Sequence, residues 1–119
     1  RAVEWALERD PNLRISVFSS YRDFIIATVF LQIDPEAFEQ ALRAETTYLH
    51  ERFPDRYMPF LVQGTMHTTL LGENFGVPEA FADLVEFGGL DTTEVDGLTV
   101  SAWFRMMLDG DPGWMPVIE

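Results

Sequence analysis

The amino-acid sequence predicts an α/β fold in which a mainly parallel sheet is flanked by helices. Two short apolar runs, 13–18 and 58–62, have the length and the bounding turn residues that are typical of buried strands. Between them, the stretch 34–53 carries apolar residues at helical spacing. A strand, a helix and a second strand in this order indicate a parallel unit, because a helix can cross over the sheet between the two strands.

Further elements are expected in the first half of the chain. Residues 2–7 predict a short helix, and the turn-forming segment 10–12 ends it. The apolar run 24–30 predicts one or two buried helical turns, although its periodicity also permits a strand. Asp34 followed by Pro35 marks the start of the long helix, because a carboxylate caps free backbone N–H groups and proline suits the first helical position.

Two helices are predicted in the second half of the chain. One begins at Pro78 and ends at the glycine pair 88–89, after which a loop is expected to run to Gly97. Apolar residues within 100–107 predict the other helix, which Gly110 closes.

The last nine residues, 111–119, are expected to form an irregular tail that packs on the body of the protein through Trp114. This leaves two predicted strands, and two strands do not form a stable sheet alone. The sequence therefore predicts a part of a larger sheet.

The composition excludes several classes of function. The 20 acidic residues against 8 basic ones give a net charge of −12, which disfavours binding to nucleic acids and to anionic membrane surfaces. The longest apolar stretch, 24–31, is broken by Thr28 and is too short to span a membrane. The chain has no cysteine, which excludes disulfides, thiolate zinc sites and a cysteine nucleophile.

Asp23 and His67 are the candidate catalytic residues. Asp23 follows the first predicted strand, and His67 follows Gly64, where the chain can leave the second strand. Open α/β sheets carry their chemistry at the carboxyl ends of their strands. A histidine activates a serine hydroxyl by taking its proton, and a carboxylate holds the imidazole in the required tautomer. Acid before histidine is also the order in α/β-hydrolases, whose serine precedes both.

Structural roles are the alternative for both residues. Asp23 would then be a loop carboxylate or a helix cap, and His67 a hydrogen-bonded loop histidine. His50 is expected at the surface, near the end of the long helix. Two histidines do not supply a three-histidine zinc site, and the three acidic residues within 91–96 lack the spacing of a calcium loop. No metal or cofactor is therefore expected.

Three segments of the sequence resemble the pectin acetylesterase family, which also includes the Notum carboxylesterases. They are Ser19-Ser-Tyr-Arg-Asp23, Gly64-Thr-Met-His67-Thr-Thr-Leu70, and the tryptophan-bearing stretch from Leu98 to Trp114. The resemblance extends over most of the chain, from about Asn12 to Trp114. It implies an α/β-hydrolase that removes acyl groups from esters with a Ser-Asp-His triad, in which Asp23 is the acid and His67 the histidine. The lack of cysteine departs from many eukaryotic members and is closer to a bacterial-type branch.

The serine of such a triad has no counterpart in this sequence, because no serine stands in a Gly-x-Ser-x-Gly motif. We therefore expect residues 1–119 to be the C-terminal portion of a single α/β-hydrolase domain, incomplete on its own. Its partner would be the N-terminal remainder of that domain, which carries the serine and the oxyanion hole.

The expected function is carboxylic ester hydrolysis without a cofactor. The family resemblance implies a carbohydrate ester as substrate and a location outside the cytoplasm. The alternative is a non-catalytic acidic interaction domain that binds a protein partner. The two hypotheses differ over one contact, because only a hydrolase requires Asp23 within hydrogen-bond reach of His67.

Overall fold

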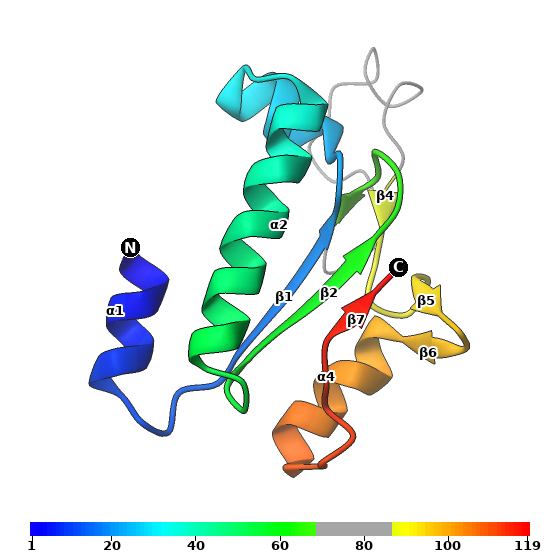
Figure 1. The fold of residues 1–119 in the computed structure, drawn as a ribbon. Coiled ribbons are helices and arrows are strands. Elements are labelled where there is room, and N and C mark those ends of the chain that lie inside the picture. The colour runs from blue at the N-terminus through cyan, green and yellow to red at the C-terminus, as the bar shows by residue number, and fades with distance from the viewer. Residues whose placement is uncertain (69–86) are drawn as a thin grey trace.

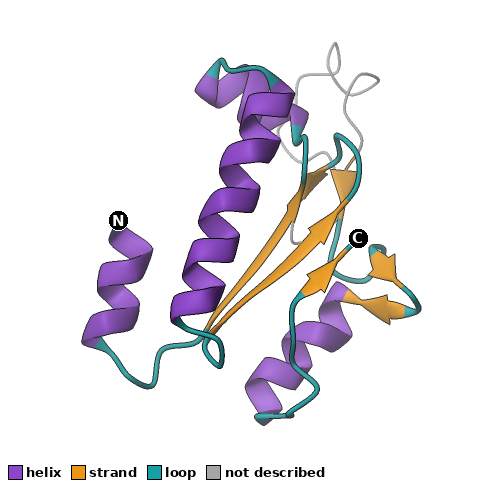
Figure 2. Ribbon diagram, in the orientation of Figure 1, coloured by secondary structure: helices purple, strands orange, loops and turns teal. Residues whose placement is uncertain are grey.

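The computed structural model describes residues 1–68 and 87–119, which form a small α/β protein with a three-stranded parallel sheet flanked by helices (Figures 1 and 2). Strand β1 (Ile15–Ser20) pairs with β2 (Tyr57–Val62), and β2 pairs with β7 (Val117–Ile118). The predicted α/β class and both predicted strands are confirmed.

Strand β7 corrects the expectation of a wholly irregular tail. Val117 and Ile118 pair in parallel with Phe60 and Leu61 of β2. A strand of two residues is too short to produce an alternating pattern, so pairing with the buried strand β2 decides its structure. Trp114 is only 5% exposed, which confirms that the tail packs through this residue.

Helix α2 (Pro35–Arg52) is the crossover between β1 and β2 and covers one face of the sheet (Figure 1). Its predicted start is confirmed, because the Asp34 side chain accepts hydrogen bonds from the backbone N–H groups of Glu36, at 2.8 Å, and Ala37, at 3.3 Å. Pro35 occupies the first helical position, where its missing N–H costs nothing.

Two clusters of buried side chains form the core on the two faces of the sheet. Tyr57 packs with Leu7, Leu49 and Phe53 beneath helices α1 (Ala2–Arg9) and α2. The alternate β2 residues Met58, Phe60 and Val62 pack instead with Val100, Trp103 and Trp114. Because successive strand residues point to opposite faces, helix α4 (Val100–Asp109) covers the face opposite α1 and α2. Among the described residues, no helix is long and apolar enough to cross a bilayer.

The apolar run after β1 is helical, as predicted, but its burial was predicted wrongly. Ile25–Leu31 forms a short π-helix, η1, which ends at Gln32 in a left-handed conformation with φ 54°. Ala27 is buried, whereas Phe30 is 73% exposed. A helix with apolar residues on every side can bury only the side that packs on the rest of the protein, so part of η1 faces outward.

Among the described residues, four short strands lie beyond the main sheet. β3 (His67–Thr68) pairs in parallel with β4 (Phe87–Gly88), and β5 (Glu94–Val95) pairs in antiparallel with β6 (Leu98–Thr99). The predicted loop up to Gly97 is therefore partly a hairpin. Asp96 and Gly97, at its tip, have φ 52° and 80°, and tight hairpin turns need such positive values.

The helix predicted to begin at Pro78 lies outside the described residues. Its predicted end is replaced by strand, because Gly88 belongs to β4. A side chain at Gly88 would collide with the thioether of Met66, so Met66 would have to move to admit one.

Candidate active site

The loop that carries Asp23 and the loop that leads from β2 to His67, the first residue of β3, are joined by backbone hydrogen bonds. Strands β1 and β2 end side by side, with Ser20 opposite Val62. Three bonds then join the loops that follow: Tyr21 N–H to Val62 at 2.9 Å, Arg22 N–H to Gly64 at 3.0 Å, and Phe24 N–H to Thr65 at 3.2 Å. Gly64 has φ 100°, which allows the chain to turn just after β2. These bonds hold the two loops together at one edge of the sheet.

Asp23 and His67 lie close together beyond the carboxyl ends of β1 and β2. Nδ1 of His67 lies 3.0 Å from Oδ2 and 3.1 Å from Oδ1 of Asp23, which confirms the predicted contact. The Asp23 side chain is fully buried, and that of His67 is 23% exposed. An ionised carboxylate only accepts hydrogen bonds, so contact with one requires the ring hydrogen of a histidine on the nearer nitrogen, here Nδ1. In the neutral ring, the basic lone pair is then on Nε2, as a general base requires.

Asp23 is also a helix cap. Its Oδ1 accepts a hydrogen bond of 3.0 Å from the backbone N–H of Ile26, and its backbone carbonyl accepts one of 2.9 Å from Ala27. The structural role that the sequence left open is therefore real, and it does not exclude contact with His67. The cap restricts rotation of the carboxylate and so helps to orient it toward the imidazole.

Ser20 was not recognised as a site residue from the sequence. It is fully buried, and its hydroxyl donates a hydrogen bond to the backbone carbonyl of Met66, the residue before His67. The sequence carries no local signal for this bond, because it depends on the pairing of β1 with β2. Ser20 therefore fixes the backbone from which His67 projects.

Three of the four serines of the chain donate hydrogen bonds in the structure. The hydroxyl of Ser16 donates to Sδ of Met107, that of Ser19 to the carbonyl of Ser20, and that of Ser20 to Met66. Ser101 lies in helix α4. Three of the hydroxyl hydrogens are thus directed to acceptors other than an imidazole.

His50 lies at the other end of the sheet. Its Nδ1 is 2.8 Å from the carbonyl oxygen of Tyr57, the first residue of β2, whereas His67 follows the last. His50 is half-buried and lies in the last turn of helix α2, near the end of the long helix as expected. Among the described residues, which include 91–96, no three potential metal-ligand side chains form a group.

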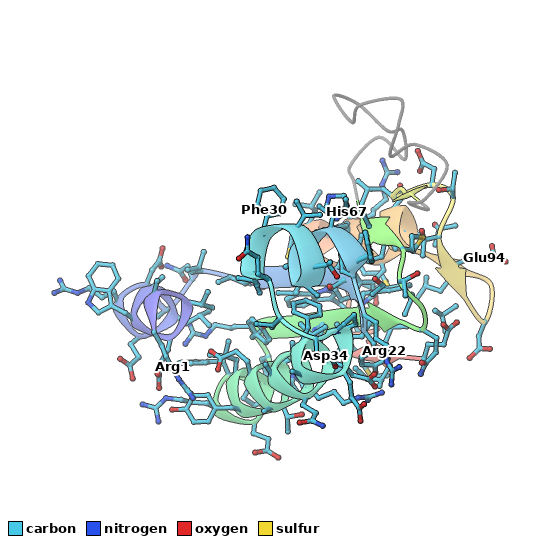
Figure 3. All side chains as sticks on the ribbon, turned by 90° about the horizontal axis from the view of Figure 1, so that it is seen from above. Arg1, Arg22, Phe30, Asp34, His67 and Glu94 are labelled. Carbon is cyan, nitrogen blue, oxygen red and sulfur yellow. The ribbon has the colours of Figure 1, made fainter. Side chains whose placement is uncertain are left out.

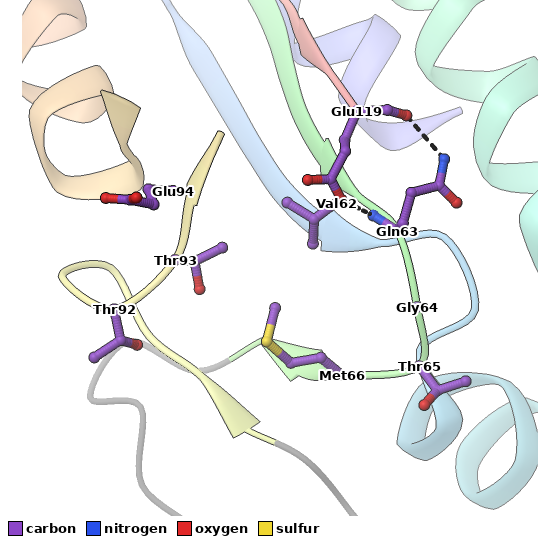
Figure 4. Close-up of a pocket in the computed structure, with 9 residues that line it drawn as sticks. All are labelled: Val62, Gln63, Gly64, Thr65, Met66, Thr92, Thr93, Glu94 and Glu119. Atoms are coloured by element: carbon purple, nitrogen blue, oxygen red, sulfur yellow. Dashed lines mark hydrogen bonds between the residues drawn. The ribbon is translucent and has the colours of Figure 1, made fainter. Parts of the chain in front are cut away.

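A cleft of about 270 Å³ adjoins the loop between β2 and His67 (Figure 4). It is lined by Val62, Gln63, Gly64, Thr65, Met66, Thr92, Thr93, Glu94 and Glu119. Met66 is among the residues that line this cleft, and His67, the next residue in the chain, is not. The sequence did not indicate this cleft, because its walls come from three segments far apart in the chain.

Comparison with known proteins finds no matching family model, no matching curated protein and no matching solved structure. The fold and the site therefore define the class only as a small α/β protein with an acid–histidine pair at a sheet edge. The resemblance to pectin acetylesterases stays a prediction.

Proposed function

We propose that this chain supplies the acid and the base of a serine carboxylic ester hydrolase of the pectin acetylesterase type. The observation that carries the proposal is the contact between a buried carboxylate and Nδ1 of a partly exposed imidazole, at 3.0 Å. The two groups follow adjacent parallel strands in the order acid, then histidine, as in α/β-hydrolases. The serine and the oxyanion hole would come from the N-terminal remainder of the same domain.

His67 acts first as a general base in this proposal. Nε2 removes the proton from the serine hydroxyl while the serine oxygen attacks the ester carbonyl, and the imidazolium then returns that proton to the departing alcohol. In the second half of the reaction, His67 activates water in the same way. Asp23 keeps the hydrogen on Nδ1 and stabilises the imidazolium with its negative charge. This chemistry needs no cofactor.

The substrate class comes from the family resemblance. It implies an acyl ester of a carbohydrate, with acetyl as the acyl group, and a protein that works outside the cytoplasm. The net charge of −12 agrees with a small-molecule substrate better than with a nucleic acid.

A protein-binding role is the second candidate, and the exposed surface of η1 favours it. Val29, Phe30 and Leu31 are 51%, 73% and 53% exposed. Phe30 and His67 lie on the same side of the molecule, away from helix α2 (Figure 3). In an interaction domain this apolar surface would bind a separate protein. In the hydrolase it would contact the remainder of the domain.

The rate of ester hydrolysis by the complete domain separates the two functions. With an activated acetyl ester as substrate, we expect His67→Ala to lower kcat by on the order of 10³-fold or more, with little change in KM. His50→Ala is the matched control, because it removes a histidine at the far end of the sheet, and its kcat should stay near that of the unmodified domain. Unchanged hydrolysis by His67→Ala would contradict the proposed function.

A further inference from the structure

We propose that the outer edge of strand β7 binds an extended peptide segment of a protein partner, which carries lysine or arginine side chains and adds a strand to the sheet. This inference goes beyond the proposed function and does not depend on it. Three features carry it: backbone groups that face outward from the strand, a cleft on each face of the strand, and an acidic side chain in each cleft.

Strand β7 lies at the edge of the three-stranded sheet. In the described part of the chain it pairs with β2 alone, on the side of β2 opposite to β1 (Figure 1). Its last residue, Ile118, is 53% exposed, so the fold leaves this strand uncovered. An exposed edge strand presents backbone groups with which another chain can pair.

The backbone of Ile118 faces away from the sheet. Ile118 pairs with Leu61 of β2, and the N–H of Glu119 donates to the Leu61 carbonyl at 3.0 Å. Successive residues of a strand direct their backbone groups to opposite sides. Because Glu119 faces β2, the N–H and the carbonyl of Ile118 face outward, where one residue of an added strand can bond to both.

A cleft lies on each face of this strand. The first, of about 190 Å³, is lined by Ile118 together with residues of helix α2, among them Thr47. The second, of about 420 Å³, is lined by Ile118 together with residues of the β5–β6 hairpin, among them Leu98. Helix α2 covers one face of the sheet, whereas Leu98 packs on the core cluster of the opposite face. The two clefts therefore flank β7.

An extended peptide matches these features together. Its backbone supplies the acceptor and the donor that the N–H and the carbonyl of Ile118 require. Its successive side chains point to opposite faces of the sheet, so one side chain reaches each cleft. A small compound bound in one cleft would use neither the other cleft nor the outward backbone groups.

The edge permits only a short contact. Strand β7 has two residues, and Pro116, which has no backbone N–H, precedes it. Short edge strands and prolines prevent open-ended addition of strands, which leads to aggregation. Backbone pairing is thus limited to Ile118 and its immediate neighbours, and the two clefts supply the specificity.

The charges of the clefts favour a basic peptide. Glu51 lines the first cleft and Asp96 the second, and the described residues that line the two clefts include no arginine or lysine. His50 also lines the first cleft, and its Nδ1 is already 2.8 Å from the carbonyl oxygen of Tyr57. Carboxylates attract lysine and arginine side chains and repel acidic ones.

The same charges disfavour a second copy of the chain at this edge. Pairing of β7 with the β7 of another copy is symmetric, so it would bring each Glu51 and Asp96 near the equivalent acidic residues of the other copy. The net charge of −12 on each chain adds to this repulsion.

Two short peptides test the inference: acetyl-KVTVK-amide and acetyl-EVTVE-amide, which differ only in the charge of their ends. Each carries a fluorescent label and is titrated into the full-length protein while its fluorescence anisotropy is measured. We expect the lysine peptide to bind saturably, and at least roughly tenfold more tightly than the glutamate peptide. Equal binding of the two peptides would overturn the inference.

Methylation of the peptide backbone shows whether the peptide adds a strand. The amide nitrogens of the central threonine and of the valine before it are methylated in turn. The methyl group on the amide that faces Ile118 should weaken binding roughly tenfold or more, whereas the other amide faces away and its methylation should change little. Equal effects of the two methyl groups would contradict strand addition.

Matched variants of the protein locate the site. Ile118→Pro removes the outward N–H and no bond to β2, so it should weaken binding of the lysine peptide roughly tenfold, whereas Ile118→Val should not. Glu51→Gln/Asp96→Asn should reduce the preference for lysine over glutamate. Glu36→Gln/Asp109→Asn removes the same charge from exposed positions outside the clefts and should preserve that preference.

Sedimentation of the unbound protein tests whether a second copy occupies the edge. We expect Ile118→Pro to leave the oligomeric state unchanged. A dimer that Ile118→Pro dissociates would assign the edge to a second copy and overturn the inference, as would undiminished binding of the lysine peptide by this variant. None of these measurements involves ester hydrolysis, so the inference fails separately from the proposed function.

Discussion

Nδ1 of His67 lies 3.0 Å from Oδ2 of Asp23, although 44 positions of sequence separate the two residues. The parallel pairing of β1 with β2 brings them together, because Ser20 and Val62 lie opposite each other at the ends of these strands. The backbone hydrogen bonds between the two loops then bring the side chains of Asp23 and His67 within hydrogen-bond distance. The pairing of the two strands and the hydrogen bonds between the loops that follow them therefore determine the geometry of the pair.

Ser20→Ala is expected to loosen the backbone segment that positions His67. The variant loses the buried hydrogen bond to the Met66 carbonyl, so its free energy of unfolding should fall by about 1–2 kcal/mol. If Ser20 positions His67, kcat for ester hydrolysis should also fall by roughly tenfold while KM stays unchanged. Ser19→Ala is the control, because its hydroxyl bonds only to the carbonyl of the next residue. A loss of stability with unchanged kcat would restrict Ser20 to a purely structural role.

Gly88→Ala is expected to displace Met66. The added methyl group would overlap with the Met66 thioether and lie 2.8 Å from Oγ1 of Thr93. Overpacking of this kind costs about 1–3 kcal/mol, which urea denaturation of the complete domain measures. The double variant Gly88→Ala/Met66→Ala should recover part of that stability, because the shorter side chain leaves room for the methyl group. Losses of stability that simply add would show that Gly88 and Met66 are not in contact.

Tyr57 is expected to make the domain less stable in alkaline solution. Burial, with a smaller contribution from Glu45, raises the pKa of Tyr57 to about 12, against about 10 in an unfolded chain. The unfolded state therefore loses its proton first, so the free energy of unfolding is constant below pH ~10 and falls as the pH rises to about 12. The loss should be on the order of 2 kcal/mol.

The matched variant for this effect is Tyr57→Phe, which removes the titrating hydroxyl from the same buried ring. Its free energy of unfolding should fall less between pH ~9 and pH ~11.5 than that of the unmodified domain. Tyr48, whose pKa is raised by its hydrogen bond to Glu4, is present in both proteins and cancels in the difference. Equal losses in the two proteins would contradict the assignment to Tyr57.

The structural elements that could be predicted from the sequence are those that are specified by residues close together in the chain. Asp34 and Pro35 begin helix α2 because a cap and a proline act on the first turn alone. Strand β7 and the exposure of Phe30 depend instead on what lies beside them in space. A two-residue strand and a helix that is apolar all round have no periodic pattern from which burial can be inferred.

The residues of the site also fall into two groups, those that could be predicted from the sequence and those that could not. Asp23 and His67 could be predicted, because each follows a strand and their order in the chain is that of a known charge relay. Ser20 could not, because its role depends on a contact between segments that are distant in sequence. The sequence contains no pattern that specifies such contacts.

The coupling between Asp23 and His67 in catalysis tests the central claim most directly. It is measured as kcat of the complete domain for an activated acetyl ester, in Asp23→Asn, in His67→Ala and in the double variant. Asparagine keeps an oxygen that can accept the hydrogen bond from Ile26, so the cap of η1 is preserved while the charge is removed. Members of a charge relay act as a unit, so the double variant should be little slower than His67→Ala alone. Separate losses that multiply in the double variant, or full activity of His67→Ala, would contradict a relay between these two residues.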